Sequence, residues 1–287
     1  MAERVKVLRV VHTIHATYDI ARCRALYLDA LGGLIFYEGY LASEDRDATL
    51  LYVGDHMIEP IAPRTPADHS KPFARMMART GESFHSFEIA VASAPEAWEQ
   101  LVEADCQVTP EAGGYFFVRR ESTGGILLEV CDVAMPNDPA DRPGWTGCIG
   151  RGHASGVIGL NHLAAVVPDA ETALTFFTTV LDGRLIEDDS IAAPQPARRC
   201  LVGLGDTDIS LIEPDGSGGV LDAFLGRSQN GIYALVWQVA DLERARNHFR
   251  ALGLDTTTED CVSGGFAIAP EHFLGARHEF MPAARPA

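Results

Sequence analysis

One short pattern occurs twice in the chain and limits what the chain can fold into. The stretches 8–19 (LRVVHTIHATYD) and 158–169 (IGLNHLAAVVPD) each place a histidine, His12 or His162, seven residues before an aspartate. Both stretches read as strands and are followed by apolar residues at helical spacing. Two separate copies of a strand followed by a helix indicate that the chain is built from duplicated units.

The same order of elements can be followed four times along the sequence. The first module is expected to contain a helix at 20–31 and strands at 5–17, 34–40, 49–53 and 56–61. A short helix at 72–79 precedes the second module, which has a helix at 95–103 and strands at 83–91, 107–110, 115–119 and 126–131. The third and fourth modules span 157–214 and 231–281, with the last helix at 242–252. The expected fold class is α+β, with four βαβββ modules.

The length and composition indicate how these modules are grouped. A chain of 287 residues with 47% hydrophobic residues is long enough for two packed cores. Residues 136–156 are rich in proline, glycine and charged residues, as linkers are. We therefore expect two domains, 1–135 and 157–287, each a pair of modules whose curved, mainly antiparallel sheets surround a cavity.

Charge and cysteine content exclude several classes of function. The formal net charge of −17 opposes binding to nucleic acid or to an anionic membrane surface. No run reaches the roughly 18 apolar residues of a membrane helix, and the N-terminus lacks a secretory signal, so we expect a cytoplasmic protein. No two cysteines form a C-x-x-C pair, so we expect reduced thiols and no zinc knuckle. The cysteines are Cys23, Cys106, Cys131, Cys148, Cys200 and Cys261.

The first domain carries a histidine or glutamate in each of four predicted strands. These residues are His12, Glu59, His85 and Glu129. Two imidazoles and two carboxylates that converge in a curved sheet form a natural octahedral site for one divalent metal ion, with two positions open. His15, three residues after His12, points to the opposite face and is expected to be structural. His56 would replace Glu59 if the strand register slipped.

The second domain keeps only part of this set. Aligning the turn at Gly54-Asp55 with the turn at Gly205-Asp206 places Ser210 at the position of Glu59. Aligning the final strands pairs Glu279 with Glu129, and aligning the first strands of the second and fourth modules pairs Ala234 with His85. With His162 and Glu279 alone, this domain is not expected to hold a metal tightly, and we interpret it as a degenerate copy that supports the first.

These residues carry a resemblance to the vicinal oxygen chelate superfamily, which includes glyoxalase I, methylmalonyl-CoA epimerase, fosfomycin-resistance proteins and extradiol ring-cleaving dioxygenases. The stretch VVHTIHATYDI resembles the first-strand motif of glyoxalase I, in which the histidine in the place of His12 is a metal ligand. The carboxylate of that family's HMIE-like strand falls on Glu59, and its second-repeat histidine falls on His85. The stretch ESTGGILLEV resembles the end of methylmalonyl-CoA epimerase, whose metal-binding glutamate falls on Glu129.

The resemblance implies one divalent ion per chain, which is Zn, Ni, Co, Mn or Fe, and a small-molecule substrate. Family members bind two neighbouring substrate oxygens and stabilise an enolate by Lewis-acid chemistry. The leading expectation is a metal-dependent isomerase, epimerase or lyase of the glyoxalase type that acts on a small oxygenated carbonyl compound. Glu59 or Glu129 would be the catalytic base.

Two alternatives stay open at this point. The four-module length resembles that of the extradiol dioxygenases, so His12, His85 and Glu129 could instead hold Fe(II) for ring cleavage, with Glu59 as a bystander. Those enzymes keep their metal in the second domain, where this chain has Ala234. The other alternative is a non-catalytic binding or resistance protein that needs no metal. The two domains could replace the dimer of shorter relatives, so a monomer or a homodimer is expected.

Overall fold

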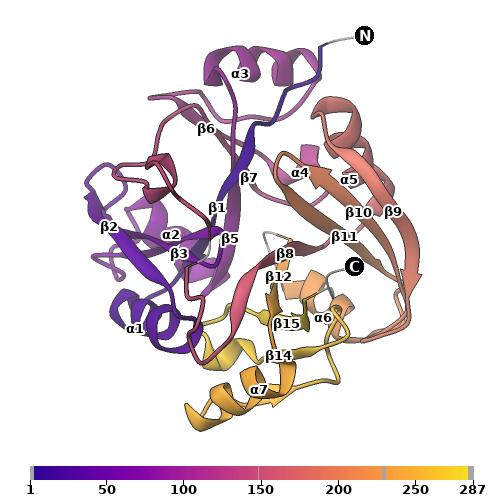
Figure 1. The fold of residues 1–287 in the computed structure, drawn as a ribbon. Helices are drawn as coiled ribbons and strands as arrows, with labels where there is room; N and C mark the ends of the chain where they lie inside the picture. Colours follow the sequence, from indigo (N-terminus) through magenta and orange to yellow (C-terminus); the bar gives the residue numbers. More distant parts are fainter. Residues whose placement is uncertain (1–2, 148, 228–230, 284–287) are drawn as a thin grey trace. The chain divides into compact units, whose positions relative to one another are not determined.

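The strands of the chain form two mixed sheets (Figure 1). The structure is a computed structural model that describes residues 3–147, 149–227 and 231–283. The seven-stranded sheet has the order β2-β3-β4-β1-β5-β7-β6. Its strands are β1 (Arg9–Ala16), β2 (Leu34–Leu41), β3 (Arg46–Val53), β4 (His56–Pro63), β5 (Ser83–Ala90), β6 (Tyr115–Val118) and β7 (Leu128–Cys131).

The second sheet has eight strands in the order β13-β14-β15-β12-β8-β11-β10-β9. Its strands are β8 (Val157–Val166), β9 (Arg184–Ile191), β10 (Ala197–Leu204), β11 (Thr207–Pro214), β12 (Ile232–Val239), β13 (Thr256–Thr257), β14 (Phe266–Ile268) and β15 (His278–Pro282). Each sheet contains parallel neighbours, β5 with β7 and β12 with β15, beside antiparallel ones. The expected α+β class is confirmed, and most of the described strand pairs are antiparallel, as expected.

The repeated aspartate of the sequence pattern begins a helix in each half. Asp19 caps α1 (Ile20–Ala25), and its side chain accepts a hydrogen bond from the backbone N–H of Arg22. Asp169 caps α5 (Ala170–Thr175) in the same way. Ser93 and Asp241 cap α3 (Ala94–Glu103) and α7 (Leu242–Ala251). In all four modules, therefore, a polar side chain caps the N-terminus of the helix that follows the first strand.

Several expected boundaries differ from the structure. The helix expected at 20–31 is α1 followed by a π-helical turn, Leu26–Ala30, and the third module repeats this arrangement at Phe176–Val180. The strand expected at 107–110 is only a single bridge between Val108 and Val118. Pro110 has no backbone N–H to donate, which prevents the pairing from continuing there.

The contacts divide the chain into two compact units. Unit 1 contains the residues up to His12, 85–134 and 162–233, and unit 2 contains 13–84, 135–161 and 234–287. Unit 1 therefore joins most of the second and third modules, and unit 2 joins most of the first and fourth. The predicted domains 1–135 and 157–287, with a linker at 136–156, stay a prediction.

Each unit has an apolar core. In unit 1 the ring of Phe87 stacks on that of Phe177, with 6.4 Å between the ring centroids. In unit 2 the buried side chain of Met77, on α2 (Pro72–Thr80), packs with those of Ile14 on β1 and Ile61 on β4.

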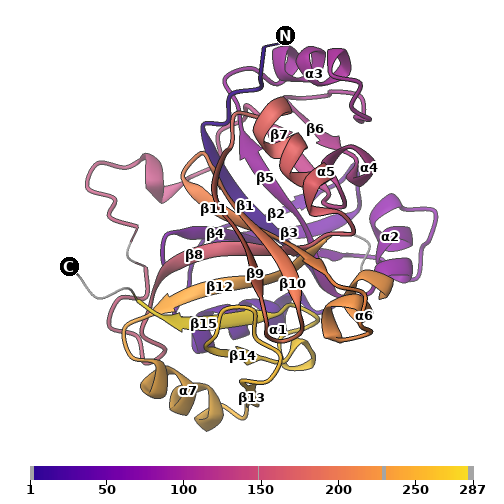
Figure 2. The ribbon, with the colours of Figure 1, turned by 90° about the vertical axis from the view of Figure 1, so that its right-hand side faces the viewer.

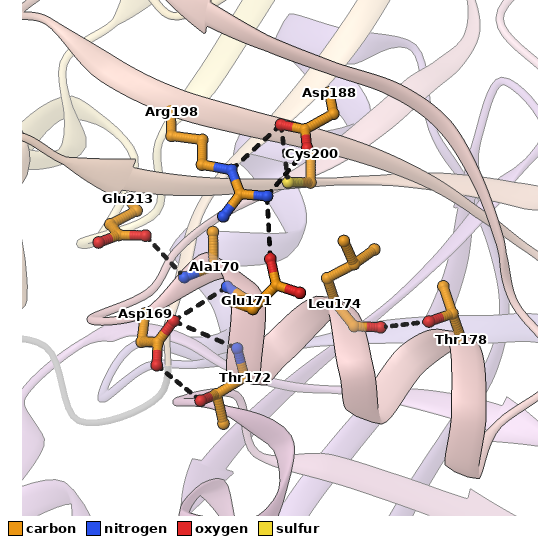
Figure 3. Close-up of polar contacts among 10 residues, drawn as sticks. All are labelled: Asp169, Ala170, Glu171, Thr172, Leu174, Thr178, Asp188, Arg198, Cys200 and Glu213. Atoms are coloured by element: carbon orange, nitrogen blue, oxygen red, sulfur yellow. Dashed lines mark hydrogen bonds and ion pairs between the residues drawn. The ribbon is translucent and has the colours of Figure 1, made fainter.

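The helices of the third and fourth modules pack on strands of their own modules. Helix α7 packs on β13 and β15 in unit 2 (Figure 2), and α5 packs on β10 and β11 in unit 1. Figure 3 shows the polar contacts between α5 and these strands. Arg198 on β10 binds Glu171 on α5 and also Asp188 on β9. The Glu213 carboxylate on β11 accepts a hydrogen bond from the backbone N–H of Ala170 at the start of α5. The remaining helices are α4 (Arg120–Thr123) and α6 (Val220–Arg227), with 3-10 turns at Pro139–Asp141 and Pro270–His272.

None of the helices in the described part of the chain is long and apolar enough to cross a bilayer. Five cysteines are free thiols, as expected, and Cys148 lies outside the described residues.

Candidate metal centre

Three potential metal ligands meet in unit 1. They are His12 on β1, Glu88 on β5 and Glu129 on β7, and one ligand atom of each lies within 4.8 Å of the others. Glu88 and Glu129 are register partners in the parallel pair β5–β7, so their side chains lie next to each other on one face. The Nδ1 atom of His12 lies 3.6 Å from Oε1 of Glu88. No other group of three such residues appears in the described ranges.

The burial and the chemistry of this trio fit a divalent cation. His12, Glu88 and Glu129 are only 3%, 3% and 7% exposed. Two neighbouring buried carboxylates repel each other and lose their hydration, so a cation between them would stabilise both. One imidazole nitrogen with carboxylate oxygens is a donor set that Mn²⁺, Fe²⁺, Co²⁺ and Zn²⁺ all accept.

A buried thiol adjoins this trio. Cys131 follows Glu129 by two residues on β7, and its Sγ donates to Oε1 of Glu88 at 3.0 Å. Burial raises the pKa of the Cys131 thiol well above its usual value, and the nearby Glu88 raises it further. A carboxylate only accepts, so the thiol is the donor in this contact.

The other two predicted ligands lie elsewhere. His85 is on β5 but only half-buried; its Nδ1 lies 2.9 Å from Oγ of Ser86, and its ring meets that of Phe117 edge-on. Because His85 and Glu88 are three residues apart on a strand, they point to opposite faces of the sheet. The structure thus brings together His12 and Glu129, with Glu88 in place of His85.

Glu59 lies on β4 in unit 2, where an arginine binds it. Its Oε1 accepts from Nη1 of Arg46 at 3.0 Å, and Arg46 also donates to Glu44. Burial alone would lower the pKa of Arg46, but the Glu59 and Glu44 carboxylates hold it above its usual value. The Glu59 carboxylate already has a cationic partner.

His15 and His56 both take part in hydrogen bonds inside unit 2. The Nδ1 atom of His15 lies 3.0 Å from the hydroxyl of Tyr27 and its Nε2 lies 2.9 Å from the carbonyl oxygen of Leu274. His56 pairs with the hydroxyl of Thr13 at 2.9 Å. The structural role expected for His15 agrees with these contacts.

The helix caps provide the signal that the sequence alignment missed. Seven residues before the four capping residues lie His12, Ser86, His162 and Ala234. Ser86, rather than His85, is therefore the counterpart of Ala234. Ser86 and Glu88 are both buried and two residues apart, so they share a face. Counting seven residues back from Ser93 in the sequence would therefore have selected the face of β5 that carries Ser86 and Glu88.

In the fourth module an arginine side chain binds Glu279, the equivalent of Glu129. Glu279 is fully buried and accepts from Nε of Arg277 at 2.8 Å and from the backbone N–H of Ser263 at 2.9 Å. In the second module Leu127 stands where the fourth has Arg277, and in the fourth Val236 stands where the second has Glu88. A guanidinium therefore neutralises the carboxylate here.

Comparison with known proteins supports the superfamily resemblance. Residues 159–272 match the model of the Glyoxalase/Bleomycin resistance protein/Dioxygenase superfamily. None of the curated proteins compared matches the chain. The match lies in the second half of the chain, whereas the three clustered ligands lie in the first.

Solved structures of similar fold cover most of the chain. A triple mutant of 4-hydroxymandelate synthase from Streptomyces coelicolor is 20% identical with a TM-score of 0.66, over 87% of this chain and 76% of that one. An extradiol ring-cleaving dioxygenase from B. fuscum is 14% identical with a TM-score of 0.62, over 98% and 73%. A 2,3-dioxygenase from Pseudomonas sp. KL28 is 15% identical with a TM-score of 0.58, over 99% and 96%. At these identities the likeness shows the fold alone.

Proposed function

We propose that this vicinal oxygen chelate protein is a metal-dependent isomerase, epimerase or lyase that acts on a small oxygenated carbonyl compound. The observation that carries the proposal is the buried trio of His12, Glu88 and Glu129, whose ligand atoms lie within 4.8 Å of one another. These three residues would hold one divalent ion. When bound, such an ion supplies Lewis-acid stabilisation of negative charge on a substrate oxygen.

Glu129 is our candidate for the catalytic base. It is the most exposed of the three clustered residues, so it is the carboxylate that a substrate reaches most readily. Released from the ion, it would take a proton from the carbon next to the substrate carbonyl and return it to the same or a neighbouring carbon. Glu59, the other base considered from the sequence, is bound by Arg46 and is not one of the three clustered residues.

Metal content tests the ligand set. Protein loaded with Mn²⁺ and freed of excess metal is expected to keep about one ion per chain. His12→Ala, Glu88→Gln and Glu129→Gln are each expected to weaken Mn²⁺ binding by at least about 100-fold, since even the loss of an outer-shell partner costs 10–100-fold. Calorimetric titration with Mn²⁺ measures this.

His162→Ala is the matched control, because it removes the equivalent histidine of the other half and should leave Mn²⁺ binding unchanged. His85→Ala and Glu59→Gln test the two remaining ligands predicted from the sequence. A metal-free protein, or one whose affinity is the same after His12→Ala, would disprove the metal site and favour a binding protein.

The reaction class is tested without oxygen. Under argon, the Mn²⁺-loaded protein is expected to catalyse exchange of the protons next to the carbonyl of hydroxyacetone with D₂O, followed by NMR, and Glu129→Gln should slow this exchange by about 100-fold or more. Ring cleavage would instead require Fe(II), oxygen and His85 as a ligand. Oxygen uptake by the Fe(II)-loaded protein with catechol, without proton exchange under argon, would overturn the proposal in favour of the dioxygenase.

A further inference from the structure

One oxygen of Glu88 is shared by two neighbours. Oε1 accepts the hydrogen bond from Sγ of Cys131 at 3.0 Å and lies 3.6 Å from Nδ1 of His12. The thiol therefore contacts the carboxylate at the atom that faces the imidazole.

The strand register explains how the thiol reaches this oxygen. Glu88 pairs with Glu129, and Cys131 pairs with Ala90, whose small side chain leaves the diagonal between Cys131 and Glu88 open. Cys131 is 2% exposed and Glu88 is 3% exposed, so bulk water does not compete for the contact. Inside a protein such a hydrogen bond restrains the carboxylate more strongly than it would at the surface.

The fourth module offers an internal comparison. Val236 stands at the position of Glu88 there, and Met281 stands at the position of Cys131. Neither the carboxylate nor the thiol donor is present, although the equivalent of Glu129 is retained as Glu279. The donor and its acceptor thus occur together in the module that carries the trio and are replaced together in the module that does not.

We infer that Cys131 is a positioning residue of the metal site: its S–H holds the Glu88 carboxylate toward His12 and Glu129 and so sets the affinity for the ion. This inference rests on the proposed metal-dependent function. Outer-shell hydrogen-bond partners of metal ligands fix ligand orientation in this manner, and their removal weakens metal binding by about 10–100-fold.

Mn²⁺ titration of variants tests the role of the thiol. Cys131→Ala and Cys131→Val both remove the donor, and the valine variant keeps most of the volume, so both should bind Mn²⁺ about 10–100-fold more weakly. Cys131→Ser retains an O–H donor and should recover most of the affinity. Cys261→Ala, which removes a buried thiol in unit 2, is the matched control and should bind like the unmodified protein.

A double-mutant cycle identifies Glu88 as the group through which Cys131 acts. In the Glu88→Gln background the further change Cys131→Val should alter Mn²⁺ affinity by less than about threefold. If Cys131→Val binds Mn²⁺ as tightly as the unmodified protein while His12→Ala does not, the positioning role is wrong and the metal site stands. If the unmodified protein binds no Mn²⁺, the proposed function and this inference both fail.

Discussion

Acidification from pH 6.5 to pH 4 is expected to destabilise both units, and unit 2 more steeply than unit 1. Burial lowers the pKa of His162 in unit 1 to about 4, helped by the Arg199 guanidinium. In unit 2 burial lowers the pKa of His15 to about 4, partly opposed by the bond to Leu274 and by Glu82, and it lowers the pKa of His278 well below its usual value. All three histidines are therefore neutral in the folded protein at neutral pH.

The direction of the effect follows from proton uptake. An unfolded histidine has a pKa near 6.5, so below that pH the unfolded state binds more protons than the folded state, and stability falls as the pH falls. Each such histidine contributes about 1.4 kcal/mol per pH unit between the unfolded and folded pKa values. Among the histidines whose pKa is lowered, His15, His153 and His278 lie in unit 2 and His162 lies in unit 1, which predicts a steeper loss for unit 2.

A chain of hydrogen bonds explains why unit 2 excludes the extra proton. Trp237 donates to Nδ1 of His278 at 2.9 Å, so the His278 proton lies on Nε2, which faces the Tyr27 hydroxyl at 3.4 Å. Tyr27 can then donate to Nδ1 of His15, whose Nε2–H donates to the Leu274 carbonyl. The indole at one end only donates and the carbonyl at the other only accepts, so the direction of every bond is set. A second proton on His278 would place its Nδ1–H against the indole N–H, two donors face to face. A second proton on His15 would take away the acceptor of the Tyr27 hydroxyl.

Urea unfolding between pH 7 and pH 4, followed by hydrogen exchange in each unit, measures the two slopes. His15→Gln replaces the imidazole with a group that does not titrate and should reduce the slope of unit 2 by about one proton. His69→Gln, at an exposed position, is the control and should leave both slopes unchanged. A stability that is flat over this pH range, or an unchanged unit 2 slope in His15→Gln, would contradict the prediction.

The repeat made most of the architecture predictable from the sequence. The pattern of a histidine seven residues before an aspartate located β1 and β8 and the start of α1 and α5, because Asp19 and Asp169 are helix caps whose chemistry is local. The short helix expected at 72–79 is α2. Local signals of this kind need no knowledge of which strands pair.

The candidate site was less predictable because it depends on strand register. An error of one residue in aligning β5 moves a side chain to the other face, and this separates His85 from Glu88. The arginine partner of Glu59 could not be foreseen either, since Arg46 reaches it across the pairing of β3 with β4. Which pairs of modules pack into compact units is likewise a long-range property that no single stretch of sequence encodes.

Replacing Arg277 with leucine is expected to destabilise unit 2 by about 3–5 kcal/mol, the usual cost of leaving one charge of a buried pair uncompensated. Glu279 is 0% exposed, and Arg277, which donates to it at 2.8 Å, is the cationic partner described for it. The variant copies the second module, where Leu127 stands at this position, but it leaves Glu279 buried. The free energy of unfolding in urea gives the effect.

The double variant Arg277→Leu, Glu279→Gln separates the cost of a buried unpaired charge from the cost of lost side-chain packing. An amide oxygen at residue 279 can still accept from the N–H of Ser263, but the side chain no longer carries a charge that needs a cation. Most of the lost stability should therefore return, because replacing both members of a buried pair is often nearly neutral. A loss below about 1 kcal/mol in the single variant, or a double variant no more stable than the single one, would show that the guanidinium is not what neutralises Glu279. Recovery in the double variant would mean that the Arg277 side chain supplies the charge that keeps Glu279 buried, whereas its counterpart Glu129 lies beside Glu88 and His12 in the trio proposed to hold a metal ion.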